Sequence, residues 1–194
     1  MNKKVYAVSI IVIIVCFTAV GSVFVTRHSI PKSQSISPPG YIQLILNQVT
    51  ILEQEASGWV VNNQGAYWGN DSLNGFPLNQ LAADDRLYFY FSQNVCPPCM
   101  ITTIELIKQY FPDYDHNDAV VFLSRDWPHR LRNNCYGKRL LTLQKGTLGI
   151  FNEDIPFFFK LSPEMKLTSI HIITKADFER TETYLKELSS LLTL

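Results

Sequence analysis

Two cysteines stand three residues apart in the sequence Val95-Cys96-Pro97-Pro98-Cys99. The nucleophile in disulfide exchange is a thiolate, and a second cysteine one helical turn away is near enough to form a disulfide with the first. We expect Cys96 to attack a substrate disulfide and form a mixed disulfide, which Cys99 then resolves. The pair therefore predicts thiol-disulfide exchange through a redox-active Cys96–Cys99 disulfide, with no cofactor.

The other two cysteines, Cys16 and Cys135, do not extend this pair into a metal site. Half of a zinc site is an alternative for the pair, but a zinc ribbon needs a second Cys-x-x-Cys motif, and the chain has none. Four cysteines are also too few for a disulfide-stapled scaffold. Cys135 lies in the basic, polar stretch 130–139, where we interpret it as a solvated cysteine rather than a third redox thiol.

The residues on either side of the pair predict a strand and a helix that position it. Residues 87–91 are an aromatic, apolar run of strand length, which suits a strand buried on both faces. After the pair, apolar residues recur at helical spacing over residues 100–111. Proline is tolerated in the first turn of a helix. The two prolines therefore place Cys96 at the helix start, where free N–H groups and the helix dipole favour a thiolate.

Further elements complete an α/β domain. Residues 119–124 predict a second buried strand, so the helix between the two strands forms a right-handed βαβ crossover. Residues 157–161 and 166–173 predict a hairpin. Thr174 is expected to cap a final helix, with Asp177 as its capping-box partner. This order predicts an α/β sandwich with a mixed central sheet flanked by helices.

The N-terminus carries an apolar segment without charges, residues 5–25. At 1.5 Å per residue such a helix spans about 30 Å, the hydrocarbon thickness of a bilayer. Lys3 and Lys4 precede the segment, which favours an N-terminus in the cytoplasm. We predict a single-pass signal-anchor transmembrane helix; the alternatives are a signal peptide cleaved near residues 19–21 and, less compatible with the length, a buried soluble helix. Either membrane interpretation places the domain on the bacterial periplasmic or another extracytoplasmic side.

The chain is thus expected to have three parts. Residues 1–26 form the signal anchor, residues 27–40 a tether rich in Pro and Ser, and residues 41–194 the domain with an N-terminal helical extension. Apolar residues at helical spacing over residues 41–54 predict that this extension is an amphipathic helix packed on the domain. The formal net charge is zero, which argues against nucleic acid as a partner.

The order of these motifs resembles the thioredoxin-like superfamily over residues 76–194. The pattern is most similar to the membrane-anchored TlpA/ResA-like thiol-disulfide oxidoreductases, which are relatives of the redoxin and AhpC/TSA-type domains; residues 76–91 resemble their approach to the strand before the cysteine pair. The resemblance implies that Pro156 is the cis-proline of the family and lies beside the pair, and that Ile155 and Pro156 help to bind the substrate backbone. It also implies a protein disulfide or dithiol as substrate and an upstream electron donor.

The chain departs from the family pattern at the site. Val95 replaces the usual tryptophan before the first cysteine, Tyr90 replaces the buried aspartate of thioredoxin, and no acidic residue lies in the first turn after Cys99. Two alternatives to a reductase of protein disulfides therefore stay open. One is a non-catalytic binding module, and the other is a metallochaperone that holds copper through Cys96, Cys99 and His171. We interpret His171, in an apolar strand-like run, as an ordinary strand histidine.

The pKa of Cys96 is expected to be only modestly depressed. Pro97 and Pro98 have no N–H to offer the sulfur, and no Lys, Arg or His is adjacent to the pair in the sequence. We predict a value below the reference of about 8.5, nearer to about 7 than to the roughly 3.5 of a strong oxidant. Such a value suits a reductase.

Overall fold

The computed structural model describes residues 39–62, 66–68, 75–125, 134–144, 146–149 and 154–192. The apolar segment 5–25 and the tether up to residue 38 lie outside this part of the chain, as does Cys16. No helix within the described ranges is long and apolar enough to cross a membrane. The predicted signal anchor therefore stays a prediction.

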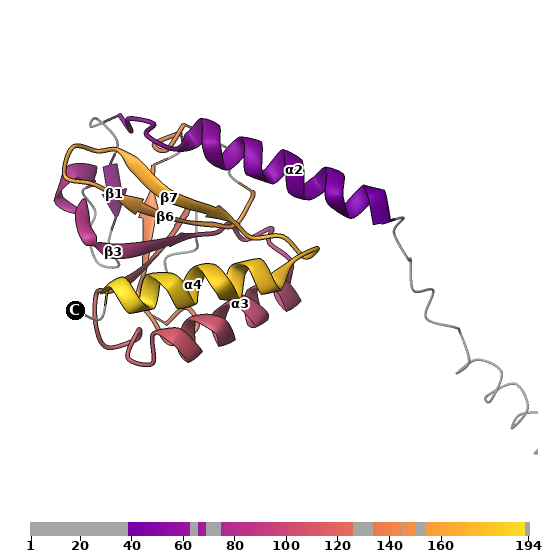
Figure 1. Ribbon diagram of the computed structural model, residues 1–194. Helices are drawn as coiled ribbons and strands as arrows, with labels where there is room; N and C mark the ends of the chain where they lie inside the picture. Colours follow the sequence, from indigo (N-terminus) through magenta and orange to yellow (C-terminus); the bar gives the residue numbers. More distant parts are fainter. Residues whose placement is uncertain are drawn as a thin grey trace, which may run out of the picture. The chain divides into compact units, whose positions relative to one another are not determined.

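A mixed sheet forms the centre of the described part, with seven strands in the order β2-β1-β5-β4-β3-β6-β7 (Figure 1). Strands β3, β4 and β5 run parallel to one another, whereas β6 is antiparallel to β3, β7 to β6 and β1 to β5. The bounds are β1 Ala66–Trp68, β2 Phe76–Pro77, β3 Ala83–Tyr90, β4 Val120–Arg125, β5 Leu140–Leu143, β6 Phe157–Leu161 and β7 Leu167–Ile172.

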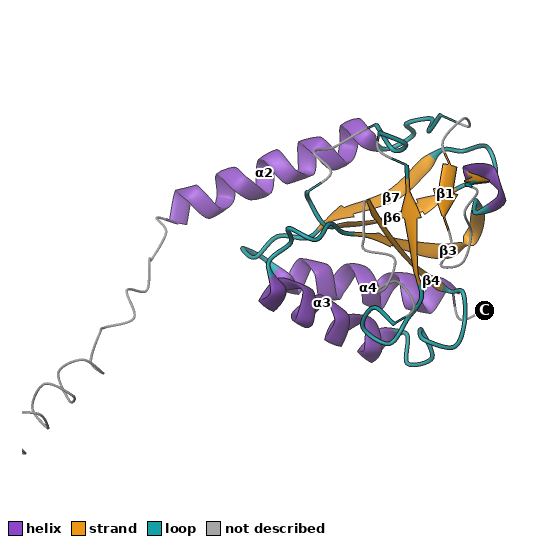
Figure 2. Ribbon diagram, turned by 180° about the vertical axis from the view of Figure 1, so that it is seen from behind, coloured by secondary structure: helices purple, strands orange, loops and turns teal. Residues whose placement is uncertain are grey.

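Helices cover the two faces of this sheet. Helix α2, Pro39–Ala56, lies on one side and packs against β7. Helices α3, Pro97–Tyr110, and α4, Phe178–Leu192, lie side by side on the other (Figures 1 and 2). A short 3-10 helix, Leu78–Gln80, precedes β3. The predicted α/β sandwich, its βαβ crossover and its hairpin are therefore confirmed.

The second half of β3, residues 87–90, is apolar and buried on both faces of the sheet, whereas Asp84 and Asp85 in its first half are exposed. Tyr88 and Tyr90 point into the cluster on the α2 side, and Phe89 and Phe91 point into the cluster beneath α3 and α4. Phe89 stacks on Phe158 of β6 with ring centroids 4.7 Å apart. These aromatic pairs hold the end of β3 rigidly, which fixes the start of the cysteine loop that follows it.

The final helix starts later than the sequence predicted. It begins at Phe178, and the Asp177 side-chain oxygen accepts a hydrogen bond from the Arg180 amide at 3.0 Å. Asp177 is thus the N-cap, whereas the Thr174 hydroxyl oxygen accepts the Ala176 amide at 2.9 Å within the preceding turn. Residues 174–177 thus form a separate turn between β7 and α4.

Cys135 is buried at 5% exposure, so its interpretation as a solvated cysteine is wrong. A two-residue hairpin turn brings it inward: Tyr136 and Gly137 have φ of 53° and 88°, and the Lys138 amide donates to the Cys135 carbonyl oxygen at 3.1 Å. Burial raises the pKa of the Cys135 thiol to about 12. This thiol is therefore unreactive at neutral pH.

Lys138, in the same turn, is also buried although it carries a charge. Its ammonium group donates to the main-chain oxygens of Tyr114 and Asn117, and the Tyr114 hydroxyl donates in turn to the Tyr136 carbonyl. Phe122 lies on the side of the sheet that faces α3, where its ring stacks on that of Tyr114 with centroids 5.9 Å apart. The buried charge is thus satisfied by main-chain oxygens, which a composition-based interpretation of the segment does not reveal.

Candidate functional site

Cys96 occupies the N-cap of α3, where the sequence placed it. Its φ and ψ of −52° and 119° are not helical, and Pro97 and Pro98 open the helix directly after it. The preceding loop turns tightly, because the Asn94 amide donates to the Ser92 hydroxyl at 3.1 Å. The Cys96 sulfur therefore sits at the positive end of the α3 dipole.

The two thiols differ in exposure. Both are free, and Cys96 is partly exposed whereas Cys99 is buried at 8% exposure. Cys99 lies one turn into α3, and its carbonyl oxygen accepts the Thr103 hydroxyl at 2.8 Å. The thiol that we expect to attack is therefore accessible, and the thiol that we expect to resolve the mixed disulfide is buried.

The two thiols also differ in acidity. The pKa of Cys96 is lowered, first by a hydrogen bond from the Cys99 thiol and then by the Cys99 main-chain N–H, while desolvation opposes the shift. Burial raises the pKa of Cys99, and the neighbouring Cys96 raises it further. The site is therefore prepared for a thiolate on the exposed sulfur and a proton on the buried one.

The first turn of α3 offers few main-chain N–H groups to the Cys96 sulfur, because two of its residues are prolines. The Cys99 N–H serves the Cys96 sulfur, whereas the Met100 N–H donates to the Cys96 carbonyl oxygen at 3.1 Å. The two prolines thus leave the sulfur with few main-chain donors. Lys175, in the turn after β7, also lowers the pKa of Cys96, though less than Cys99 does.

Lys175 is the residue that sequence reasoning missed. It lies far along the chain from the pair, and no motif marks it. The pKa of Lys175 is raised by its hydrogen bond to Cys96 and by the charge of that thiolate. One sequence signal does point to this residue. Lys175 follows the second strand of the predicted hairpin, and the first strand of that hairpin starts beside the cysteine loop.

Ile155 and Pro156 lie at the same end of the sheet as the pair. Phe157, the next residue, pairs with Tyr90 at the end of β3, and the Pro156 carbonyl oxygen accepts the Ile173 amide at 3.0 Å. No cis peptide bond occurs among the described residues, so the Ile155–Pro156 bond is trans and the prediction of a cis-proline is wrong. The sequence position of Pro156 indicates which strand it precedes but does not determine the isomer of its peptide bond. Trans is the intrinsically preferred isomer even before proline.

Two of the three departures from the family pattern, Tyr90 and Val95, are accommodated by apolar packing. Tyr90 is buried at 3% exposure and its ring lies 5.2 Å from that of Phe157, in the place where the family has a carboxylate. Val95 packs at the margin of the apolar cluster beneath α3. Neither side chain can accept a proton from Cys99 at neutral pH.

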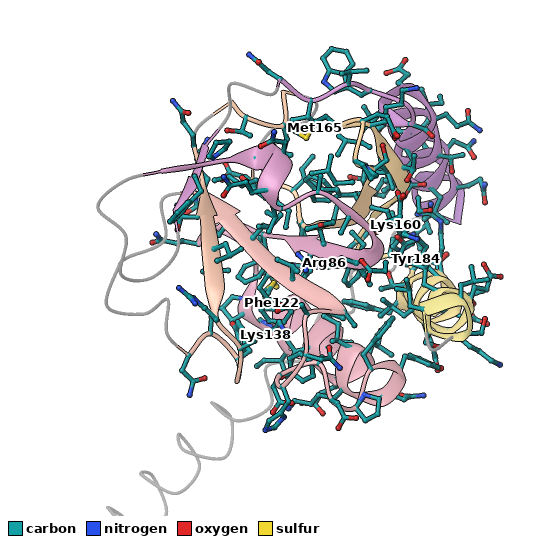
Figure 3. All side chains as sticks on the ribbon, turned by 90° about the vertical axis from the view of Figure 1, so that its left-hand side faces the viewer. Arg86, Phe122, Lys138, Lys160, Met165 and Tyr184 are labelled. Carbon is teal, nitrogen blue, oxygen red and sulfur yellow. The ribbon has the colours of Figure 1, made fainter. Side chains whose placement is uncertain are left out.

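His171 is a buried structural residue. It is 3% exposed, its Nε2 atom lies 2.9 Å from the Thr181 hydroxyl, and its Nδ1 atom lies 3.8 Å from a Glu53 oxygen. Tyr184, which extends from α4 (Figure 3), stacks on the imidazole with centroids 4.5 Å apart. The described residues contain no group of three or more His, Cys, Asp or Glu side chains placed to hold a metal ion. The copper ligand set of Cys96, Cys99 and His171 is thus not assembled.

The burial of His171 predicts that acid destabilises the protein. Burial lowers its pKa to about 3, and the Arg180 charge contributes. In the unfolded chain the imidazole binds a proton below about pH 6.5, whereas the folded chain keeps it neutral. Stability is therefore lost as pH falls from 6.5 toward 3, by about 2 kcal/mol at pH 5.

Urea unfolding at pH 7.5 and pH 5 measures this loss. The His171→Gln variant should show a smaller drop between the two pH values than the wild type. A matched change at the exposed His116, His116→Gln, should keep the wild-type drop. Equal drops in the wild type and the His171 variant would contradict the assignment.

Two hollows of the described surface are not lined by the cysteines. One, of about 370 Å³, is lined by charged residues that include Arg86, Asp118 and Arg139, and another, of about 510 Å³, lies beside α4 at His171 and Arg180. Cys96 itself is partly exposed and can be reached from the surface.

Helices cover both faces of the mixed sheet, and the cysteine pair opens the helix that follows β3. This arrangement is a thioredoxin-like fold, as the motifs predicted.

Comparison with known proteins gives structural matches of low identity. No family model matches the chain, and no curated protein matches it. A thioredoxin-like protein from Bacteroides caccae is 20% identical, with a TM-score of 0.41 over 78% of this chain and 57% of its own. A thiol:disulfide interchange protein of the thioredoxin family from Chlorobium tepidum is 11% identical, with a TM-score of 0.40 over 71% and 96%. BsSco, of the Sco family of cytochrome c oxidase assembly proteins, is 11% identical, with 0.40 over 71% and 99%.

Proposed function

We propose that this chain is an extracytoplasmic thiol-disulfide oxidoreductase that reduces protein disulfides through Cys96 and Cys99. The observation that carries the proposal is the contrast between the two thiols. Cys96 is partly exposed with a lowered pKa, and Cys99 is buried with a raised pKa. An attacking thiol must reach its substrate as a thiolate, and a resolving thiol must stay protonated until the mixed disulfide has formed.

The reaction balances with the two cysteines alone. The Cys96 thiolate attacks one sulfur of the substrate, the substrate S–S bond breaks, and the other substrate sulfur leaves as a thiolate that takes up a proton. Cys99 then loses its proton and attacks the Cys96 sulfur, which breaks the mixed disulfide and releases the second substrate thiol. The substrate gains two electrons and Cys96–Cys99 becomes a disulfide, which an upstream dithiol protein must reduce for the next cycle.

The location is part of the proposal. The apolar segment 5–25 would anchor residues 1–26 in a membrane, with the N-terminus inside. The tether 27–40 would then hold the domain 41–194 on the periplasmic or other extracytoplasmic side. This organisation supports a place among the TlpA/ResA-like anchored oxidoreductases, where proteins that contain disulfides are available as substrates.

Reduction of insulin by dithiothreitol, followed by turbidity, tests the activity. The full chain should shorten the lag before precipitation, and the Cys96→Ser variant should behave as the protein-free control. A wild-type protein that leaves the lag unchanged would identify a binding module instead. No observation in the described residues favours the copper metallochaperone, and a copper titration of the reduced chain that gave a tight one-to-one complex would restore it.

A further inference from the structure

The end of the sheet opposite the cysteine loop carries the hollow of about 370 Å³. Strands β3, β4 and β5 run parallel, and the cysteine loop follows the end of β3. The hollow lies where β4 and β5 begin: Asp118 comes just before β4, Val121 lies near the start of β4, and Arg139 directly precedes β5. Its volume is within the range of small-molecule sites. The hollow is therefore a feature separate from the thiols.

The floor of the hollow is apolar. Leu81 and Val121 belong to the buried core cluster on the α2 side of the sheet, and Leu141 packs against that cluster. Phe76 of β2 adds a ring that is 41% exposed. Helix α2 packs against β7, at the other edge of the sheet from β2, and supplies none of the lining residues. The floor is thus open to a ligand that has an apolar body.

Three cationic residues line the hollow, namely Arg86 of β3, Lys138 and Arg139. Lys138 is only 7% exposed, and its ammonium group donates to the main-chain oxygens of Tyr114 and Asn117. These hydrogen bonds use two of its three N–H groups and do not neutralise its charge, although buried charges are normally paired. No ion pair among the described residues involves any of the three cations. The hollow thus presents positive charge without a counter-charge in contact.

Two aspartates limit the negative charge that the hollow can accept. Asp115 and Asp118 also line it, and the Asp115 Oδ1 atom lies 2.6 Å from the Nδ1 atom of the exposed His116. The cations exceed the carboxylates by one when His116 is neutral. One anionic group therefore matches the site, whereas a polyanion would also meet repulsion from the two carboxylates.

We propose that this hollow binds a small organic monoanion, a carboxylate attached to an apolar body. The carboxylate accepts hydrogen bonds from Arg86, Lys138 and Arg139, and the planar guanidinium groups suit its two oxygens. The apolar body covers Val121 and Phe76 on the floor. Binding involves no covalent or redox step, and the inference does not depend on the proposed function.

Isothermal titration calorimetry of the reduced full chain with benzoate tests the site, after subtraction of a titration into the same detergent buffer without protein. Benzoate should bind one to one. Acetate lacks the apolar body, benzyl alcohol lacks the charge, and adenosine triphosphate carries several charges, so each should bind about tenfold more weakly or worse. These comparisons use the wild type alone and hold even if a variant fails to fold.

Variants locate the binding. Arg86→Gln and Arg139→Gln each remove one cation and should weaken benzoate binding about tenfold, as loss of a charge-assisted hydrogen bond does. Lys186→Gln removes a positive charge from the exposed face of α4 and should leave the affinity unchanged. Cys96→Ser should also bind benzoate as the wild type does, because the thiol lies at the other end of the sheet.

Absence of benzoate binding, equal binding of benzyl alcohol or tighter binding of adenosine triphosphate would overturn the inference. Wild-type affinity in both arginine variants, or a loss of affinity in Cys96→Ser, would overturn it as well. The insulin assay is read separately. A chain that reduces insulin without binding benzoate loses only this inference, and one that binds benzoate without reducing insulin loses only the proposed function.

Discussion

Replacement of Cys99 by alanine is expected to trap the protein in mixed disulfides with its substrates. Cys96 keeps its exposed position at the start of α3, so it still attacks, but the thiol that completes the exchange is missing. Steady-state insulin reduction should fall to the background rate, and a covalent adduct should appear that dithiothreitol releases. Non-reducing gel electrophoresis followed by mass spectrometry of the adduct measures both.

Two matched variants make the trapping experiment specific. Cys96→Ala should capture nothing, because Cys99 is buried and its pKa is raised. Cys135→Ala, in the background of Cys99→Ala, should capture as much as Cys99→Ala alone, since the Cys135 thiol is buried in the core. Capture through Cys99 in the Cys96 variant would reverse the two roles.

Removal of the Glu53 carboxylate is expected to lower the stability of the protein strongly, because this group links α2 to β7 and α4. Glu53 reaches from α2 to the outer edge of the sheet, where its carboxylate accepts the Ile172 amide at 2.6 Å and pairs with Arg180 of α4. The carboxylate is only 10% exposed, and β7 is an edge strand whose amide would otherwise lack a partner. Glu53→Ala leaves both groups unpaired and should cost about 3 kcal/mol.

Urea denaturation at pH 7.5 measures that loss. Glu53→Gln keeps an oxygen for the Ile172 amide and should cost less than Glu53→Ala. Glu55→Ala, on the exposed face of the same helix, should stay within about 0.5 kcal/mol of the wild type. If Glu53→Ala and Glu55→Ala had equal effects, the carboxylate would not be the link between α2, β7 and α4.

The sequence was sufficient for the elements around the cysteine pair because each is encoded locally. The aromatic run before Cys96 and the two prolines after it determine where β3 ends and where α3 begins. Apolar spacing also predicts helix α2. It does not predict the ion pair between Glu53 of this helix and Arg180 of α4. Periodicity and turn chemistry indicate which elements form, and they do not indicate which exposed side chains meet.

The features that the sequence did not predict depend on contacts between distant segments. The turn that carries Lys175 lies at the same end of the sheet as the cysteine loop because β3, β6 and β7 align their ends, which no spacing along the chain reveals. Cys135 is buried in a turn in which it pairs with Lys138, whose ammonium group donates to the main-chain oxygen of Tyr114. Helix α4 begins at Phe178, later than predicted, because Asp177 rather than Thr174 is its N-cap. Both residues have side chains that suit this position.

The reduction potential of the Cys96–Cys99 pair in the full chain tests the central claim most directly. Equilibration with dithiothreitol redox buffers, followed by quenching and mass spectrometry, gives the fraction of disulfide at each potential. We predict a single two-electron transition nearer to the roughly −270 mV of thioredoxin than to the roughly −120 mV of a strong oxidant. A pair that never forms its disulfide would contradict an oxidoreductase, and a potential at the oxidant end would contradict a reductase.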